Sequence, residues 1–278
     1  MFNSLIEAQD LYLIINDRDT VVVDCRFSLQ ITEAGRKAYL EGHIPGAVYA
    51  HLDEDLSGTR VAGTTGRHPL PDVVHCEQLF SKWGIDAAVQ VVVYDDQGAA
   101  FASRLWWMLR WLGHDKVAVL NGGWKSWKQK QLPVSQSIQF KNPRLFVPVL
   151  QEDLTVTAEL LVANLSAAEF QVVDSRAPER YSGEVEPIEP VAGHIPGAHN
   201  FPFGENLDSD GRFHSSEALR ARFRPLGNAV STVFYCGSGV TACHNVLAWC
   251  HAGLGMPRLY PGSWSEWITD DSRPVERS

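Results

Sequence analysis

The chain carries the same series of sequence landmarks twice, and this repetition limits its possible folds more than any other feature. Each series contains a β-branched run ending in Asp-x-Arg, a Gly-His-Ile-Pro-Gly-Ala hexapeptide, an apolar strand-like run and a Gly-x-Trp-x-x-Trp motif. The landmarks keep their order and return after about 140 to 150 residues, which indicates two copies of one domain. They lie at 21–26 and 172–176, 42–47 and 193–198, 91–95 and 233–236, and 122–127 and 262–267.

Within each copy, short β-branched runs alternate with helix-like stretches such as 102–112 and 217–224. Such alternation predicts an α/β fold with a parallel sheet that is covered on both faces. We predict an N-terminal domain over 1–131 and a C-terminal domain over 156–278. The proline-containing stretch 132–155 is predicted to link them. A length of 278 residues suits two such domains.

The composition argues against several classes of function. A formal net charge of −9 disfavours nucleic acid and anionic membrane surfaces as partners. No apolar run approaches the roughly 20 residues that a membrane span needs, and Met1–Asp10 has no basic region typical of a secretory signal. The five cysteines include no close pair, so neither a disulfide framework nor a metal site is expected. We therefore expect a reducing, cytoplasmic compartment.

The stretch Val233–Ala242 is the strongest candidate for chemistry. An apolar strand-like run leads into Cys236, and a helix-like run follows from Ala242. Unpaired amides at a helix N-terminus favour an anion, and so they favour the nucleophilic thiolate form of a cysteine. Gly237 and Gly239 are expected to adopt positive φ angles and to curl the amides around one point. The alternative is a buried structural cysteine, which the adjoining Gly-Ser-Gly disfavours.

The two copies differ at the nucleophile position. Where the second copy has Cys236, the first has Asp95. A carboxylate cannot form a persulfide, so we predict that the N-terminal copy is non-catalytic. It either contributes residues to the site of the second copy or serves as a scaffold.

With these motifs, the chain resembles the tandem rhodanese-like sulfurtransferases, from about Val21 to Trp267. This resemblance implies two tandem domains, each a mainly parallel five-stranded sheet with helices on both faces. The loop Cys-Gly-Ser-Gly-Val-Thr at 236–241 is similar to that of the 3-mercaptopyruvate type. The thiosulfate-preferring type resembles Cys-Arg-Lys-Gly-Val-Thr, whose two cations suit a dianionic substrate.

The resemblance implies sulfur transfer without a cofactor. The Cys236 thiolate attacks a donor, 3-mercaptopyruvate or thiosulfate, and carries the sulfur as a persulfide to a thiol or cyanide acceptor. A thioredoxin-like reductant is a candidate partner. Two alternatives stay open, namely a thiosulfate-preferring enzyme and a non-catalytic sulfur-relay or binding module. The implied substrate-binding loop residues are Gly237, Gly239, Val240 and Thr241.

The resemblance also implies a Ser–His–Asp set that assists proton movement, matched here by Ser238, His68 and Asp53. A surface histidine and a helix cap are the structural alternatives for His68 and Asp53. Arg180 matches one family arginine for the donor carboxylate, since a guanidinium suits that group bidentately.

The family's second arginine should precede Gly193, but the stretch 183–192 contains none. This absence weakens the preference for mercaptopyruvate unless another cation substitutes, and His199 and Arg104 are the candidates. Arg26 and Arg176 are expected instead to brace strand ends by pairing with the adjacent aspartates.

A cysteine phosphatase is the sharpest rival from another class of enzyme. That chemistry needs an arginine six positions after the cysteine, where this chain has Ala242. The repeated histidines (His43, His194) and tryptophans (Trp124, Trp127, Trp264, Trp267) are predicted to be structural, and Cys243 and Cys250 are predicted to be buried.

Overall fold

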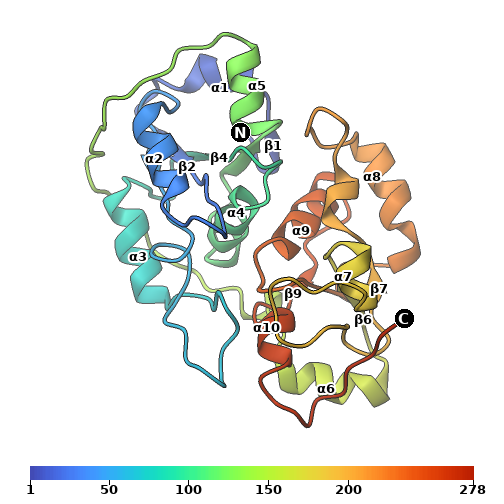
Figure 1. The fold of residues 1–278 in the computed structure, drawn as a ribbon. Helices are drawn as coiled ribbons and strands as arrows, with labels where there is room; N and C mark the ends of the chain where they lie inside the picture. The colour runs from blue at the N-terminus through green and yellow to red at the C-terminus, as the bar shows by residue number, and fades with distance from the viewer. The chain divides into compact units, whose positions relative to one another are not determined.

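The computed structural model describes residues 1–278 and divides them into two compact units (Figure 1). Unit 1 comprises Met1–Gly58, Pro71–Gln151 and Ser209–Arg212. Unit 2 comprises Thr59–Leu70, Glu152–Asp208 and Phe213–Ser278. A segment from the first half of the sequence, Thr59–Leu70, is therefore part of unit 2.

Unit 1 is built on a five-stranded parallel sheet with the strand order β1-β5-β4-β2-β3. The central strands β2 (Thr20–Asp24) and β4 (Gln90–Tyr94) are rich in buried valine, as expected for strands covered on both faces. The other strands are β1 (Leu5–Ile6), β3 (Val48–Tyr49) and β5 (Val117–Leu120). The helices are α1 (Ala8–Ile14), α2 (Ala34–Glu41), α3 (Val73–Lys82), α4 (Ala102–Trp111) and α5 (Gly123–Gln129).

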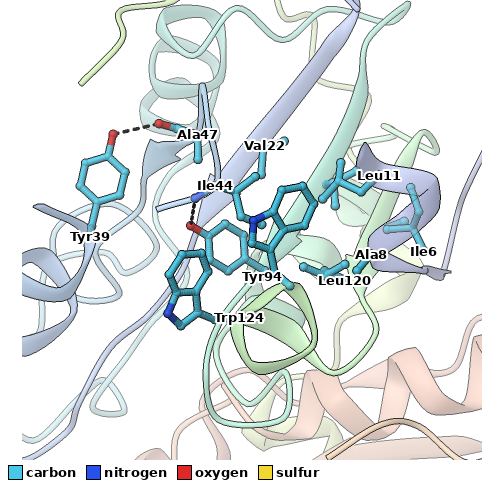
Figure 2. Close-up of a cluster of buried hydrophobic side chains, with 13 residues drawn as sticks. Ile6, Ala8, Leu11, Val22, Tyr39, Ile44, Ala47, Tyr94, Leu120 and Trp124 are labelled. Carbon is cyan, nitrogen blue, oxygen red and sulfur yellow. Dashed lines mark hydrogen bonds between the residues drawn. The ribbon is translucent and has the colours of Figure 1, made fainter. Parts of the chain in front are cut away.

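Polar groups inside the unit 1 core are hydrogen-bonded to one another. Figure 2 shows the amide of Ile44 donating to the hydroxyl of Tyr94 (3.2 Å) and the Tyr39 hydroxyl donating to the Ala47 carbonyl (2.8 Å). Both bonds tie the Gly-His-Ile-Pro-Gly-Ala turn to the core. The hexapeptide is thus a structural motif, because its backbone satisfies buried tyrosine hydroxyls.

Unit 2 repeats this plan with a four-stranded parallel sheet, in the order β7-β6-β8-β9. The expected fifth strand is reduced to a single parallel bridge between Thr155 and Leu259, so the prediction of five strands is wrong for this copy. The strands are β6 (Gln171–Asp174), β7 (His199–Asn200), β8 (Thr232–Tyr235) and β9 (Arg258–Leu259).

The helices of unit 2 are α6 (Ala158–Ala167), α7 (Pro178–Ser182), α8 (Ser216–Phe223), α9 (Ala242–His251) and α10 (Ser263–Trp267). Short 3₁₀ turns are η1 (Glu152–Leu154), η2 (Phe203–Asn206) and η3 (Arg224–Leu226). None of the helices in the structure combines the length and the apolar character that a membrane-spanning segment requires.

The duplication extends to individual buried contacts. In both copies the Asp-x-Arg motif forms a buried ion pair of 2.6 Å, and the same guanidinium donates to the first glycine carbonyl of the hexapeptide at 2.7 Å. In both copies the histidine stacks on a tyrosine and bonds its carbonyl. The predicted structural roles of these residues are confirmed (Arg26, Arg176, His43, His194).

The tryptophan pairs are buried as predicted, with Trp124 being the most exposed at 9%. Cys243 is fully buried inside α9. Cys250 is only half-buried, so its predicted burial is wrong. It lies in the last turn of α9, where its sulfur faces Met256.

Candidate active site

Cys236 directly follows β8 at the carboxyl end of a central parallel strand, the usual location of ligand sites in such sheets. Its amide donates to the Ser263 hydroxyl (3.1 Å) and its carbonyl accepts from the Trp264 amide (3.0 Å). The loop 236–241 then leads into α9, whose N-cap Thr241 makes no side-chain capping bond. Cys236 is 1% exposed, and the ten-residue helix α9 begins six positions after it in the chain.

The two glycines of the loop differ in backbone conformation and in what surrounds them. Gly239 has a φ of 73°, and a Cβ there would lie 2.1 Å from the carbonyl oxygen of Pro261, so only glycine fits. Gly237 is not among the positive-φ residues, and the prediction for it is wrong. A Cβ at Gly237 would instead lie 3.5 Å from Nη2 of both Arg67 and Arg180. Its missing side chain keeps the space in front of these cations open.

Ser238 and His68, which are 170 residues apart in the sequence, meet in unit 2. Nδ1 of His68 lies 2.8 Å from the Ser238 hydroxyl, and both side chains are 4% exposed. Nη2 of Arg67 donates to the same hydroxyl at 3.2 Å. Two of the three predicted proton-handling residues are thus brought together. Asp53 lies in unit 1, exposed in the turn after β3.

Arg180, on α7, is held by a buried carboxylate. Its Nε and Nη2 atoms donate to Glu186 at 2.7 to 3.2 Å. Glu186 also accepts from Nη1 of Arg176 (3.2 Å) and from the amides of Ile188 and Glu189. Burial by itself raises the pKa of Glu186, but hydrogen bonding and the charge of Arg180 outweigh it, and the pKa is lowered overall. Glu186 is therefore ionised at neutral pH.

Arg67 is the site residue that sequence reasoning missed. Its Nη1 atom donates to Glu189 at 2.6 Å, and these side chains are 19% and 8% exposed. The Arg67 amide donates to the Ser265 hydroxyl, which anchors the backbone beside the Cys236 loop. Burial raises the pKa of Glu189, and the charge of Arg67 opposes that rise. The sequence did contain one indication, because the stretch 183–192 has three glutamates and no cation. Buried carboxylates need cationic partners from elsewhere in the chain.

The equivalent loop of unit 1 is closed by its own side chain. The Asp95 carboxylate accepts four backbone N–H bonds of 2.8 to 2.9 Å, from Gln97, Ala99, Phe101 and Ala102. Burial raises the pKa of Asp95, and these hydrogen bonds oppose the rise. The amides of this loop are thus already hydrogen-bonded to the loop's own side chain.

The remaining predicted residues differ in burial and in the unit that holds them. Val240 is buried within the Cys236 loop, and His199 is exposed on β7 of unit 2. Arg104 is buried in α4 of unit 1.

One cluster in unit 1 has the donor types of a metal site, with ligand atoms of Glu33, His51 and Glu54 all within 4.8 Å of one another. Arg36 donates to both of these carboxylates. The guanidinium thus offsets one of the two negative charges, and the two carboxylates are held in an ion-pair network with Arg36.

A family model described as a rhodanese-like domain matches residues 7–130 and again 157–270. The chain belongs to the rhodanese family, with the domain in two tandem copies. Among curated relatives, it is 48% identical to the probable 3-mercaptopyruvate sulfurtransferase of Pseudomonas aeruginosa, over 98% of this chain and 97% of the relative. It is 40% identical to the putative thiosulfate sulfurtransferase SseB of Mycobacterium tuberculosis, over 98% and 96%.

Among solved structures, the 3-mercaptopyruvate sulfurtransferase of Leishmania major superposes with a TM-score of 0.85 at 31% identity, over 98% of this chain and 76% of that one. SseA of Escherichia coli superposes with a TM-score of 0.80 at 28% identity, over 95% and 100%. Within the family this protein is an enzyme of the sulfurtransferase class.

Proposed function

We propose that this enzyme takes sulfur from 3-mercaptopyruvate, holds it as a persulfide on Cys236 and passes it to a thiol or to cyanide. The observation that carries this proposal is the pair of guanidiniums facing Gly237, next to the nucleophile. A donor with a carboxylate near its reactive sulfur fits this arrangement. The relative at 48% identity carries the corresponding name, which supports the assignment.

The chemistry is nucleophilic catalysis in two half-reactions. The Cys236 thiolate attacks the sulfur of mercaptopyruvate, a sulfur–sulfur bond forms, and the carbon–sulfur bond breaks. The electron pair leaves with the carbon as pyruvate enolate, which gains one proton to become pyruvate. An acceptor thiolate or cyanide then attacks the outer sulfur and regenerates the Cys236 thiolate. Loop amides at 237–241 stabilise the negative sulfur in both steps.

In this proposal, Ser238 and His68 move the proton that the enolate needs. Their 2.8 Å contact supports a relay in which His68 acts through the Ser238 hydroxyl. Asp53 is proposed as the third member, on the family resemblance alone.

Two alternatives lead to different measurements. A thiosulfate-preferring enzyme is suggested by the name of the M. tuberculosis relative, but the loop has Gly237 and Ser238 where that type places cations. A relay module that only carries sulfur between proteins would show no turnover with small donors.

The test combines turnover and intact mass. We expect pyruvate release from mercaptopyruvate with an acceptor present, and an adduct of about 32 Da, one sulfur, on the donor-treated protein. Cys236→Ser should abolish both, whereas the control Cys250→Ser should keep them. The enzyme proposal fails if neither pyruvate from mercaptopyruvate nor sulfite from thiosulfate is released. An adduct persisting in Cys236→Ser would show that another cysteine reacts.

We also propose a reducing, cytoplasmic setting with a thioredoxin-like acceptor. All five cysteines are free thiols in the structure, the state that a reducing compartment maintains. Reduction of the persulfide enzyme by thioredoxin, followed as NADPH oxidation by thioredoxin reductase, should depend on Cys236. A rate equal to that without the donor would exclude this acceptor.

A further inference from the structure

The stretch 183–192 supplies carboxylates where the family resemblance leads one to expect an arginine. It contains Glu184, Glu186 and Glu189 and no cation. Glu186 pairs with Arg180 and Arg176, and Glu189 pairs with Arg67. The stretch therefore holds guanidiniums in place instead of providing one.

Arg67 lies where a second donor-binding cation is needed. Its Nη2 atom and that of Arg180 are each 3.5 Å from the point at which Gly237 would carry a Cβ. A small group just in front of Gly237, one residue from Cys236, would therefore lie close to both guanidiniums. Carboxylates are well matched to two such forks because each oxygen accepts more than one N–H bond.

Both guanidiniums keep N–H groups available in front of Gly237. Glu186 occupies only Nε and Nη2 of Arg180, and Nη1 lies 3.6 Å from the same position. Glu189 occupies Nη1 of Arg67, while Nη2 bonds Ser238 with one of its two N–H groups. The two glutamates thus accept hydrogen bonds from one edge of each guanidinium and leave N–H groups on another edge for a ligand.

We propose that Arg67, positioned by Glu189, is the second carboxylate-binding residue of this enzyme, and that the pair sets its preference among donors. The proposal rests on the proposed sulfur transfer from mercaptopyruvate and names a residue that the family pattern does not supply. Each guanidinium is already neutralised by a carboxylate, so the site offers directed hydrogen bonds with little net charge. Such a site suits the single carboxylate of mercaptopyruvate better than the dianion thiosulfate.

The first experiment measures kinetics with both donors for Arg67→Ala, Arg67→Lys and the exposed control Arg224→Ala. Loss of a charged hydrogen-bond donor predicts a fall in kcat/KM for mercaptopyruvate of roughly ten- to a hundredfold, mostly as a higher KM. Arg67→Lys should recover part of this loss because it keeps the charge without the fork. Since Arg67→Ala leaves Glu189 buried without its partner, the double variant Arg67→Ala/Glu189→Gln is measured beside it. An unchanged KM in both would overturn the proposal.

The second experiment tests donor preference. Glu189→Gln removes one negative charge near the bound donor, which favours a dianion over a monoanion. We expect the ratio of kcat/KM for thiosulfate to that for mercaptopyruvate to rise roughly tenfold. The exchange Arg67→Glu/Glu189→Arg should regain most of the mercaptopyruvate activity that Arg67→Glu loses, because it restores one cation and one anion. The proposed role of the Arg67–Glu189 pair would be contradicted if Glu189→Gln left this kcat/KM ratio unchanged. It would also be contradicted if the exchange variant regained no mercaptopyruvate activity.

A third measurement separates this proposal from the proposed function. Iodoacetate and iodoacetamide both alkylate a thiolate, and only the first carries a carboxylate. Arg67→Ala should lower the ratio of their rates at Cys236 roughly tenfold, whereas Arg224→Ala should not change it. If the wild type released no pyruvate but kept this Arg67-dependent ratio, the sulfur-transfer proposal would fail and the carboxylate site would stand. Pyruvate release with an Arg67-independent ratio would instead retain sulfur transfer and remove Arg67 from carboxylate binding.

Discussion

Replacing Glu186 with glutamine tests whether one buried carboxylate positions Arg180, the arginine that we propose to bind the donor. The Glu186 side chain is 3% exposed and accepts bonds from Arg180, Arg176 and two backbone amides. Glutamine keeps one accepting oxygen and points an NH₂ group at guanidiniums that can only donate. Breaking a buried ion pair by removing one partner costs about 3–5 kcal/mol. Because glutamine keeps some of the hydrogen bonds, we expect a loss of about 3 kcal/mol in the stability of unit 2.

The same substitution should change the pH dependence of stability. Burial raises the pKa of Glu186 and the bond and charge of Arg180 lower it by more, so the native pKa lies below the ordinary value of 4.5. A lowered native pKa contributes stability that is fully present above about pH 4.5 and is lost as pH falls through the native pKa. The gap between wild type and Glu186→Gln should therefore be widest near pH 7 and narrow below pH 4.5.

The assay is urea unfolding followed by tryptophan fluorescence at pH 7 and pH 4, with mercaptopyruvate kinetics at pH 7. We expect kcat/KM to fall at least tenfold, since Arg180 loses its fixed orientation. Glu205→Gln is the matched control, because Glu205 pairs with Arg222 but is 63% exposed. It should change stability by less than about 1 kcal/mol. A Glu186→Gln midpoint equal to that of the wild type at pH 7 would refute the reasoning.

Four further substitutions test the two loops and the Ser238–His68 contact. Gly239→Ala places a Cβ against the Pro261 carbonyl at a residue with positive φ, so we expect the free energy of unfolding to fall by about 2 kcal/mol or more. Little persulfide should form on this variant. Unfolding and intact-mass values equal to those of the wild type would contradict the steric argument. Asp95→Asn should lower the stability of unit 1 by about 2 kcal/mol, because one of the two accepting oxygens is lost, while the sulfur adduct on Cys236 still forms. An unchanged unfolding midpoint would mean that the loop amides do not depend on the second carboxylate oxygen. Ser238→Ala and His68→Ala should each slow pyruvate release, and the double variant should be no slower than the worse single variant; additive losses would separate the two residues.

Much of the fold could be predicted because its signals are local. The valine-rich runs form the central strands of both sheets, and the repeated hexapeptide makes the same turn in each copy. The edge pairing of unit 2 could not be predicted, since one bridge at Thr155 leaves no alternating pattern to read. Edge strands of two residues, such as β7 and β9, depend on their neighbours rather than on their own residues.

The same contrast between local and long-range signals applies to the residues of the candidate active site. Cys236 and its loop belong to one contiguous motif, and the family resemblance correctly paired His68 with Ser238. Arg67 could not be found in this way, because its partners Glu189 and Ser238 are 122 and 171 residues away in the sequence. Gly237 shows a further limit, since the sequence does not reveal that its φ is not positive or that it lies in front of two guanidiniums.

The two copies together indicate what kind of ligand the second loop is built to hold. In unit 1 four loop amides converge on the Asp95 carboxylate, so the loop presents its N–H groups to one acceptor at its centre. At the same position in unit 2 the chain has Cys236, the residue that we propose as the nucleophile. The two copies thus differ in one side chain, a hydrogen-bonded carboxylate in the first and a sulfur that can react in the second. This single exchange accounts both for the lack of sulfur chemistry that we predict in the first copy and for the nucleophile that we propose in the second.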